Sequence, residues 1–322
     1  MNKKFLPGAV LFIITFVLSN LATLAQVKAQ ANTFYGDGAG ANTTTGIFDS
    51  AFGYQAFYYN TSGSENTAIG RRALVNNIDG QSNTANGAEA LYSNTNGNSN
   101  TASGYQALFS NTTGHHNTAS GLYGLRANTT GNYNTVSGEE ALYSNTIGNN
   151  NTASGSAALY DNMTGSENTA SGAAALFSNT TGSYNAASGY QALLSNTAGG
   201  FNAANGAFVL YNNTIGNFNT AAGPGALLSN TTGSNNVAVG TTAGIALTTG
   251  SGNVCIGAGV SGVAGESNTT RIRNVYTTVA NGRAVYVNAD NKIGTLSSSR
   301  RFKHAHHRAT DQDSRQLTFM GR

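Results

Sequence analysis

The chain contains little of what conventional domains are built from. Among its 322 residues are one cysteine, two prolines and no tryptophan, and only 9% are charged, against roughly 25% in ordinary globular domains. A lone cysteine excludes a disulfide framework and a cysteine zinc site, so we expect Cys255 to be a small buried filler. The 41 glycines and 43 asparagines instead favour a narrow, repeated, hydrogen-bonded fold.

The net charge of +3 comes from the two ends of the chain. Residues 32–257 hold nine acidic and three basic side chains, whereas residues 258–322 hold four acidic and ten basic ones. A protein that binds nucleic acid needs a concentrated basic surface on its folded body. The long middle is mildly acidic, so we expect no nucleic-acid partner.

The N-terminus has the layout of an export signal. Two lysines precede an apolar run from Phe5 to Ala25, and small residues follow up to Ala31. This pattern is typical of a secretory signal peptide, with cleavage after Ala31 or Ala25. The alternative is a transmembrane anchor, since the run approaches the length that spans a bilayer. We predict a signal peptide over residues 1–31, a secreted or cell-surface protein, and no membrane span after cleavage.

A period of seventeen residues organises the middle of the chain. One glycine column runs from Gly36 to Gly257 and a second from Gly46 to Gly250, both at intervals of 17. The consensus coil, N-T-A-S-G-x-x-A-L-[YF]-S-N-T-T-G-x-x, is too short for a helix pair and rich in poor helix formers. We therefore predict an all-β, parallel β-solenoid of 17-residue coils over residues 32–257.

Within each coil, N-T-A-x-G and A-L-[YF]-S are expected to be two extended segments joined at glycine corners. Glycine adopts positive φ at no cost, and asparagines at positions 1 and 12 can hydrogen-bond the turns and tolerate left-handed conformations. Coils about 4.8 Å apart would align identical residues into ladders. Structural turn residues on this reading include the first-column glycines Gly70, Gly87, Gly104, Gly121, Gly138, Gly155 and Gly172.

The alternation of side chains along a strand predicts which residues point into the core and which point outward. If the nearly invariant leucine at position 9 and the alanine at position 3 point inward, the neighbouring aromatic column points outward. This candidate binding stripe comprises Tyr92, Phe109, Tyr143, Tyr160, Phe177 and Tyr211, with Val75 and Arg126 as exceptions. Long exposed apolar strips mark interfaces. We favour a seam between identical subunits in a homotrimer; the alternative is a ladder that grips a ligand.

The N-T-A-x-G-x-x-A-L unit resembles the head repeats of trimeric autotransporter adhesins and the repeats of tail-fibre-domain proteins. The nearest segments are Asn236–Gly240 (NVAVG) and Asn253–Gly257 (NVCIG). This resemblance implies a left-handed parallel β-roll and a homotrimer. It covers residues 32–257, and the coiled-coil stalk and C-terminal membrane barrel of the adhesins have no counterpart in the sequence.

A second resemblance lies near the C-terminus. Residues 266–303 are similar to the start of an endosialidase-type intramolecular chaperone, whose short-strand connector ends in L-x-S-S-x-R-x-K. The resemblance implies self-cleavage by Ser298 with Lys303 as base, a chemistry open to a lysine of lowered pKa; Ser297 and Ser299 are alternatives. We expect a connector over 258–296. Because only nineteen residues follow Lys303, we expect residues 297–322 to be a truncated chaperone start with a disordered basic tail and no competent cleavage.

Other catalytic or metal-binding patterns are weak. His304, His306 and His307 lack accompanying ligands at metal spacing, so no metal and no cofactor are expected. The sequence favours a non-enzymatic fibrous structural or adhesion protein that binds an unidentified surface receptor or glycan. One alternative is the self-processing precursor described above. Another is an ice- or crystal-binding solenoid built on threonine columns, although Ala186, Ala203, Val237 and Val254 interrupt those columns.

Overall fold

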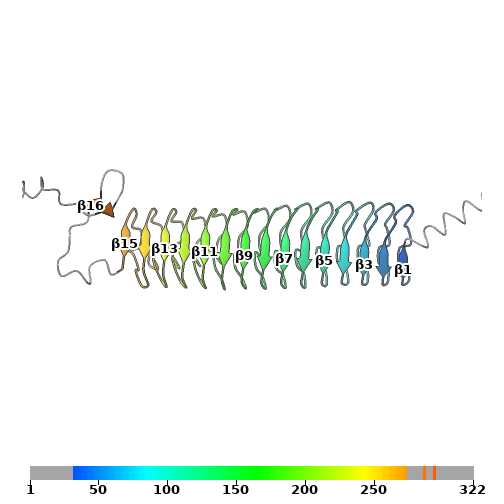
Figure 1. The fold of residues 1–322 in the computed structure, drawn as a ribbon, viewed down its shortest axis with the longest axis horizontal. Coiled ribbons are helices and arrows are strands. Elements are labelled where there is room, and N and C mark those ends of the chain that lie inside the picture. The colour runs from blue at the N-terminus through cyan, green and yellow to red at the C-terminus, as the bar shows by residue number, and fades with distance from the viewer. Residues whose placement is uncertain (1–31, 274–285, 288–292, 295–322) are drawn as a thin grey trace, which may run out of the picture. The chain divides into compact units, whose positions relative to one another are not determined.

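The computed structural model describes residues 32–273 and two short strands at 286–287 and 293–294. It confirms an all-β parallel solenoid of about fourteen turns, with no helix among these residues (Figure 1). Strands β1 to β15 form one sheet in chain order. They are β1 Thr33–Tyr35, β2 Ser50–Phe52, β3 Thr67–Ile69, β4 Thr84–Asn86, β5 Thr101–Ser103, β6 Thr118–Ser120, β7 Thr135–Ser137, β8 Thr152–Ser154, β9 Thr169–Ser171, β10 Ala186–Ser188, β11 Ala203–Asn205, β12 Thr220–Ala222, β13 Val237–Val239, β14 Val254–Ile256 and β15 Thr270–Ile272.

Each strand pairs in parallel with the equivalent residues of the next coil. Thr101 of β5, for example, pairs with Thr118 of β6, seventeen residues on. The last step is one residue shorter, from Val254 to Thr270, so the sheet continues one strand beyond the boundary at residue 257 expected from the glycine columns. By its contacts the chain divides after Arg273. In the second unit, β16 (Tyr286–Val287) and β17 (Ile293–Gly294) pair antiparallel.

The first glycine column ends each strand, as predicted. The seven glycines expected to be turn residues have φ values between 129° and 150°, which an L side chain rarely adopts. At Gly104 a Cβ atom would also lie 2.7 Å from the carbonyl carbon of Gly121 in the next coil. Positive φ and close stacking therefore both require glycine, and this limits the strands to three residues.

Glycine is required in the second column for a different reason from the one predicted. Gly114 does not have positive φ; instead, a Cβ atom there would lie 2.5 Å from the carbonyl oxygen of Gly131 and would also overlap Asn111 Oδ1. The backbones of successive coils approach so closely at this corner that no side chain fits. The expectation of a left-handed corner was wrong here, and steric exclusion explains why this column is invariant.

The segment A-L-[YF]-S was predicted to be extended, and this is wrong. It forms a turn in which the core leucines at position 9 have φ of 51° to 55°. In the coil of residues 100–116, the left-handed residues Gln106 and Leu108 donate their N–H groups in opposite directions, to Ala88 O below and Gly124 O above, at 3.0 Å each. Left-handed backbone costs an L-residue about 1–2 kcal/mol. Burying a leucine side chain is worth about 1.5–3 kcal/mol, which can offset that cost.

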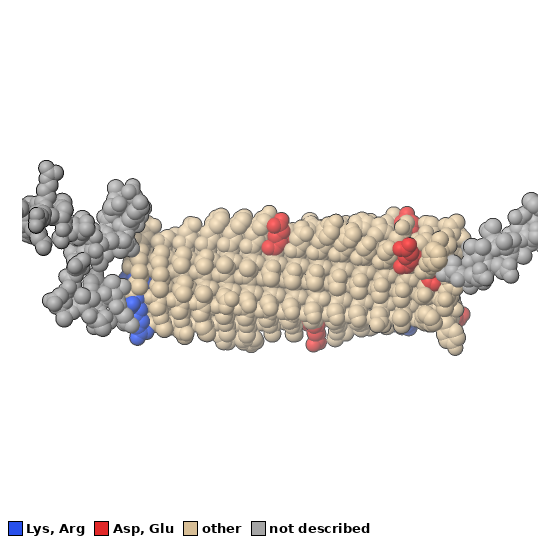
Figure 2. Space-filling model, viewed as in Figure 1, with Lys and Arg blue, Asp and Glu red and all other residues tan. Residues whose placement is uncertain are grey.

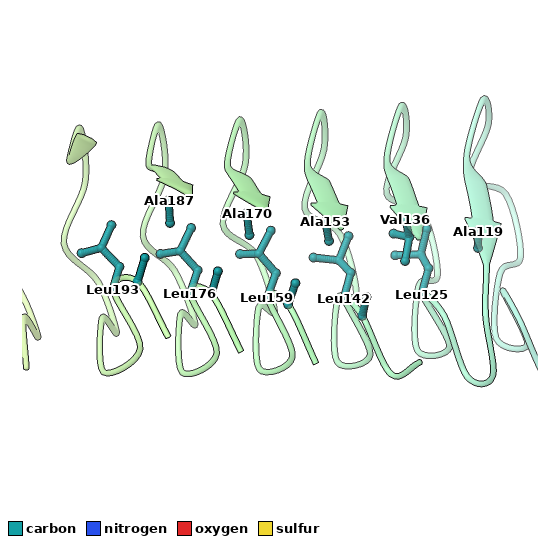
Figure 3. Packing of buried hydrophobic residues seen from close by; sticks show 14 of the residues in the cluster. Ala119, Leu125, Val136, Leu142, Ala153, Leu159, Ala170, Leu176, Ala187 and Leu193 are labelled. Atoms are coloured by element: carbon teal, nitrogen blue, oxygen red, sulfur yellow. The ribbon is translucent and has the colours of Figure 1, made fainter. Parts of the chain in front are cut away.

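The predicted inward directions of the leucine and alanine columns are confirmed. The leucines from Leu74 to Leu227 are fully buried, and the central alanine of each strand is at most 3% exposed wherever alanine occupies that position. Figure 3 shows the leucines stacked above one another and pointing toward the strand residues. Cys255 occupies the same inward column at 1% exposure, where burial raises the pKa of its thiol. The expectation of a small buried filler is confirmed.

Two buried asparagine ladders flank this core. At position 1, Asn100 Nδ2 donates to Asn83 Oδ1 and to Gly114 O, at 3.2 and 2.8 Å. At position 12, Asn111 Nδ2 donates to Asn94 Oδ1 and to the same Gly114 carbonyl, at 2.8 and 3.0 Å. The predicted hydrogen bonding is confirmed, but neither asparagine has positive φ. Both ladders converge on the glycine corner, which fixes the width of the coil.

The end coils depart from the consensus in compensating ways. In the first coil, Phe34 replaces the inward alanine, and Gly40 replaces the leucine that the phenylalanine ring would otherwise overlap. At the other end, Arg271 occupies the inward position of β15 and bonds Glu266 at 2.5 Å. Leu247 replaces a position-12 asparagine there, so the ladder stops and Asn230 Oδ1 has no hydrogen-bond partner. Atypical terminal coils of this kind cap a solenoid.

Asp49 is the one acidic residue in the position-1 ladder, and it makes the first coils sensitive to pH. Its Oδ1 accepts from Asn66, but its buried Oδ2 has no hydrogen-bond partner. Desolvation raises the pKa of Asp49 from 3.8 to about 6, against opposing hydrogen bonds from Asn66. The folded state therefore binds this proton more tightly than the unfolded state, and the resulting stability is present below about pH 4 and lost as the pH rises through 6.

We expect Asp49→Asn to stabilise the first coils by about 1–3 kcal/mol at pH 7.5, because it removes the cost of burying a charge. At pH 4, where the folded-state carboxyl is protonated and the unfolded-state carboxyl is about half protonated, the gain should be much smaller. Hydrogen exchange of the amides in residues 50–70, followed at both pH values, measures this difference. An equal effect at pH 4 and pH 7.5 would contradict the assignment.

Candidate functional site

The predicted aromatic stripe forms two stacked runs rather than one continuous strip. Tyr92 and Phe109 stack with ring centroids 4.9 Å apart and planes at 13°. Tyr143, Tyr160 and Phe177 stack at 5.1 Å with interplanar angles of 4–5°. All five are half-buried. Their ring faces are occupied by one another, so the rings present mainly edges to solvent. This geometry stabilises the coil stack, and the half-burial of the rings leaves little of their surface for a ligand to contact.

The sixth residue of the stripe stands apart. Tyr211 is flanked in its column by Leu194 and Leu228, and its ring lies 5.9 Å from that of Phe208 in a tilted arrangement. The stripe is thus aromatic from Tyr92 to Phe177, apart from Arg126, and alternates with leucine beyond Phe177.

Arg126 joins the two stacked runs. Its guanidinium carbon lies 5.2 Å from the centroid of Phe109 in the coil before and 5.6 Å from that of Tyr143 in the coil after. The same group donates to Gln106 Oε1 at 2.9 Å and to the Tyr143 hydroxyl at 3.2 Å. A planar cation can stack on aromatic faces in place of a ring. Arg126 interrupts the aromatic column in the sequence, but in the structure its guanidinium group takes the place of a ring and continues the stack.

Arg126→Ala should lower the free energy of unfolding by about 1–2 kcal/mol, because it removes both ring contacts and both hydrogen bonds. Arg126→Tyr restores the residue type found in the neighbouring coils and should stay within about 0.5 kcal/mol of the wild type. Urea denaturation of the three proteins tests this pair. Equal stability of the alanine variant and the wild type would show that the stack contributes nothing at this coil.

A second aromatic ladder, which the sequence analysis did not predict, lies at position 17. Tyr184, Phe201 and Phe218 stack at 4.6 and 4.9 Å with planes within 10°, and His116 stacks on Tyr133 at 4.8 Å. Tyr184, Phe201 and Phe218 are 48%, 51% and 55% exposed. The 17-residue spacing of these three rings was the signal that could have revealed the ladder. It forms the more exposed of the two aromatic ladders.

The third surface is the outer side of the parallel sheet. We call it the sheet face and define it as the first and third residue of each strand from β1 to β15. These residues are exposed or half-exposed, because the middle residue of each strand points into the core. Over β9 to β12, where alanines replace larger residues, the sheet face sinks into a shallow groove of about 400 Å³.

Side chains that could bind a metal or take part in catalysis are sparse on the described part of the chain. Among residues 32–273, no group of three histidine, cysteine or acidic side chains could hold a metal ion. Figure 2 shows few and scattered charges on one side of the stack. The cleavage candidates Ser298 and Lys303, the histidines of the tail and the predicted signal peptide lie outside the described residues. In the part searched, no helix is long and apolar enough to cross a membrane.

The geometry therefore provides three extended surfaces and, within the described ranges, no clustered catalytic site. Comparison of the chain with protein-family models, with curated proteins and with solved structures found no match.

Proposed function

We propose that this protein is a secreted or cell-surface fibrous element that acts in adhesion and has no catalytic activity of its own. The observation that carries the proposal is the difference between the inward and the outward positions of each coil. The inward positions repeat through the stack, whereas outward positions such as 6, 7 and 17 vary freely between coils. A solenoid of this kind holds an extended surface rigid, which suits binding by repeated contacts along its length.

The position-17 ladder is the binding surface that this proposal favours, with a surface receptor or glycan as the partner. Its three stacked rings, from the coils of β9 to β11, are about half exposed. Aromatic side chains supply a large contact area at low entropic cost. The coils of β3 and β4 carry Ser82 and Ser99 at the same position, so serine is compatible with the backbone there.

Binding of the labelled full-length protein to a glycan array and to glycan-coated beads tests the proposal. The triple variant Tyr184→Ser, Phe201→Ser, Phe218→Ser should lose at least tenfold in binding while its circular dichroism stays unchanged. A control variant, Ser82→Ala with Ser99→Ala, changes the same position in other coils and should bind like the wild type. Absence of wild-type binding, or full binding by the triple variant, would contradict this surface assignment.

An ice- or crystal-binding function is the second candidate, and one observation favours it. Seven consecutive threonines, from Thr67 to Thr169, lie in register on the sheet face, and such an array can order water. The valines at positions 237 and 254 and the alanines at 186 and 203 interrupt the array on this same face. A thermal-hysteresis assay on the full-length protein decides this candidate, and absence of hysteresis removes it.

A further inference from the structure

The sheet face is the one side of the described stack without a charged residue. None of its thirty residues is Asp, Glu, Lys or Arg, whereas other sides carry charges such as Arg71, Glu89, Glu139 and Glu167. Free protein surfaces are rich in charge, and interface cores are depleted of it. Parallel sheets, moreover, usually have both faces covered. These properties indicate that something covers the sheet face.

The third residues of the strands form a pattern that is close to symmetric about the middle strand, β8. The third residues of β1, β2 and β3 are Tyr35, Phe52 and Ile69, which are 77%, 40% and 42% exposed. Those of β13, β14 and β15 are Val239, Ile256 and Ile272, at 43%, 38% and 44%. Between these two apolar ends, the third residues of the nine strands are small or polar: serine, asparagine or alanine.

We propose that a second copy of this chain covers the sheet face, with the two rods antiparallel around a two-fold axis that lies between the β8 strands of the two copies. This axis runs along the strand direction and places β1 of one copy over β15 of the other, β2 over β14 and β3 over β13. Each apolar end then meets the opposite apolar end, so that Phe52 faces Ile256 of the second copy. A closed pair of this kind is the commonest assembly of identical chains.

The shape of the face supports the same orientation. The groove over β9 to β12 exists because Ala186, Ala203 and Ala222 replace larger residues. In the antiparallel pair these alanines face Thr118, Thr101 and Asn86 of the second copy. The half of one sheet face that carries the larger side chains thus fills the groove on the other sheet face. A parallel arrangement, coil beside equal coil, would set groove against groove and leave a void, which costs packing energy.

The area is sufficient for a stable pair. Fifteen strands about 4.8 Å apart and about 10 Å long give roughly 700 Å² for each copy, or about 1,400 Å² in total. Specific interfaces bury about 1,200–2,000 Å². Small threonine, serine and alanine side chains in the middle of the face would let the two sheets approach closely.

Light scattering of the full-length protein tests the assembly, with a mass of two chains expected. Ser154→Arg, on β8, should raise the dissociation constant at least tenfold, because the axis brings the two arginines together. Ser156→Arg lies in the same coil on an exposed side position off the sheet face, and should leave the mass of two chains unchanged. A monomer or trimer mass for the wild type, or equal behaviour of both variants, would overturn the proposal.

Spin-label distances test the orientation separately. In a Cys255→Ala background, labels at Ser156→Cys in the coil of β8 and at Thr241→Cys in the coil of β13 occupy equivalent side positions. The antiparallel pair places the first labels at the same level and the second about 48 Å apart along the rod, ten coils at 4.8 Å. Equal distances for the two labels would show parallel rods. That result would favour the homotrimer that the resemblance implies, and would leave the adhesive function untouched.

Discussion

Gly114→Ala is expected to destabilise the solenoid by about 3 kcal/mol, although it adds a single methyl group. The new Cβ atom would lie 2.5 Å from Gly131 O and 2.8 Å from Asn128 Nδ2. Neither neighbour can move freely, since the carbonyl of Gly131 accepts hydrogen bonds from both asparagine ladders. Overpacking of a rigid site commonly costs about 1–3 kcal/mol and occasionally more. We expect the coil stack to separate into two cooperative parts at this corner, because stability in a solenoid is nearly a sum over neighbouring coils.

Gly124→Ala is the matched control, ten residues away. Gly124 occupies the position-8 column, where most other coils have alanine, and a Cβ atom there meets nothing closer than 3.5 Å. Because the change only restricts the unfolded chain, it should stabilise by about 0.4–1 kcal/mol. Differential scanning calorimetry of both variants measures the contrast. If Gly114→Ala unfolds like the wild type, close stacking does not explain the second glycine column.

Asn202→Ser is expected to cost about 2 kcal/mol, because it opens the position-1 ladder. Asn202 Nδ2 donates to Asn185 Oδ1 and Gly216 O at 3.1 and 2.9 Å, and its Oδ1 accepts from the backbone N–H of Asn219 at 3.0 Å. Serine is too short to span these groups. The buried N–H of Asn219 would lose its acceptor, and such a group costs about 1–3 kcal/mol.

Asn205→Ser, at the end of the same strand, controls for the change of residue type. Asn205 is exposed on the sheet face, where six other strands have serine at the same position. The free energy of unfolding of the Asn205→Ser variant should therefore stay within about 0.5 kcal/mol of the wild type. Urea unfolding of the two variants, with hydrogen exchange at Asn219, separates the ladder from the surface. Slow exchange at Asn219 in Asn202→Ser would contradict the proposed role of the side chain.

Much of the architecture is determined by the sequence alone. An unbroken 17-residue period fixes the length of the coil, and stacked parallel strands then put identical residues above one another. Leu108 and Ala102 therefore point into the core as expected, and Asn100 and Asn111 form ladders. These features depend on local chemistry that repeats in every coil, so a single consensus coil contains them.

Only the tertiary structure decided how the backbone travels between these anchors. Positive φ at Leu108 was not visible in the sequence, because leucine favours other conformations and only contacts with coils above and below stabilise this one. The reason for Gly114 and the stacking of Arg126 between two rings likewise depend on neighbouring coils. The repeat determined that the chain stacks on itself; the distance between adjacent coils determined which residues the stacking allows.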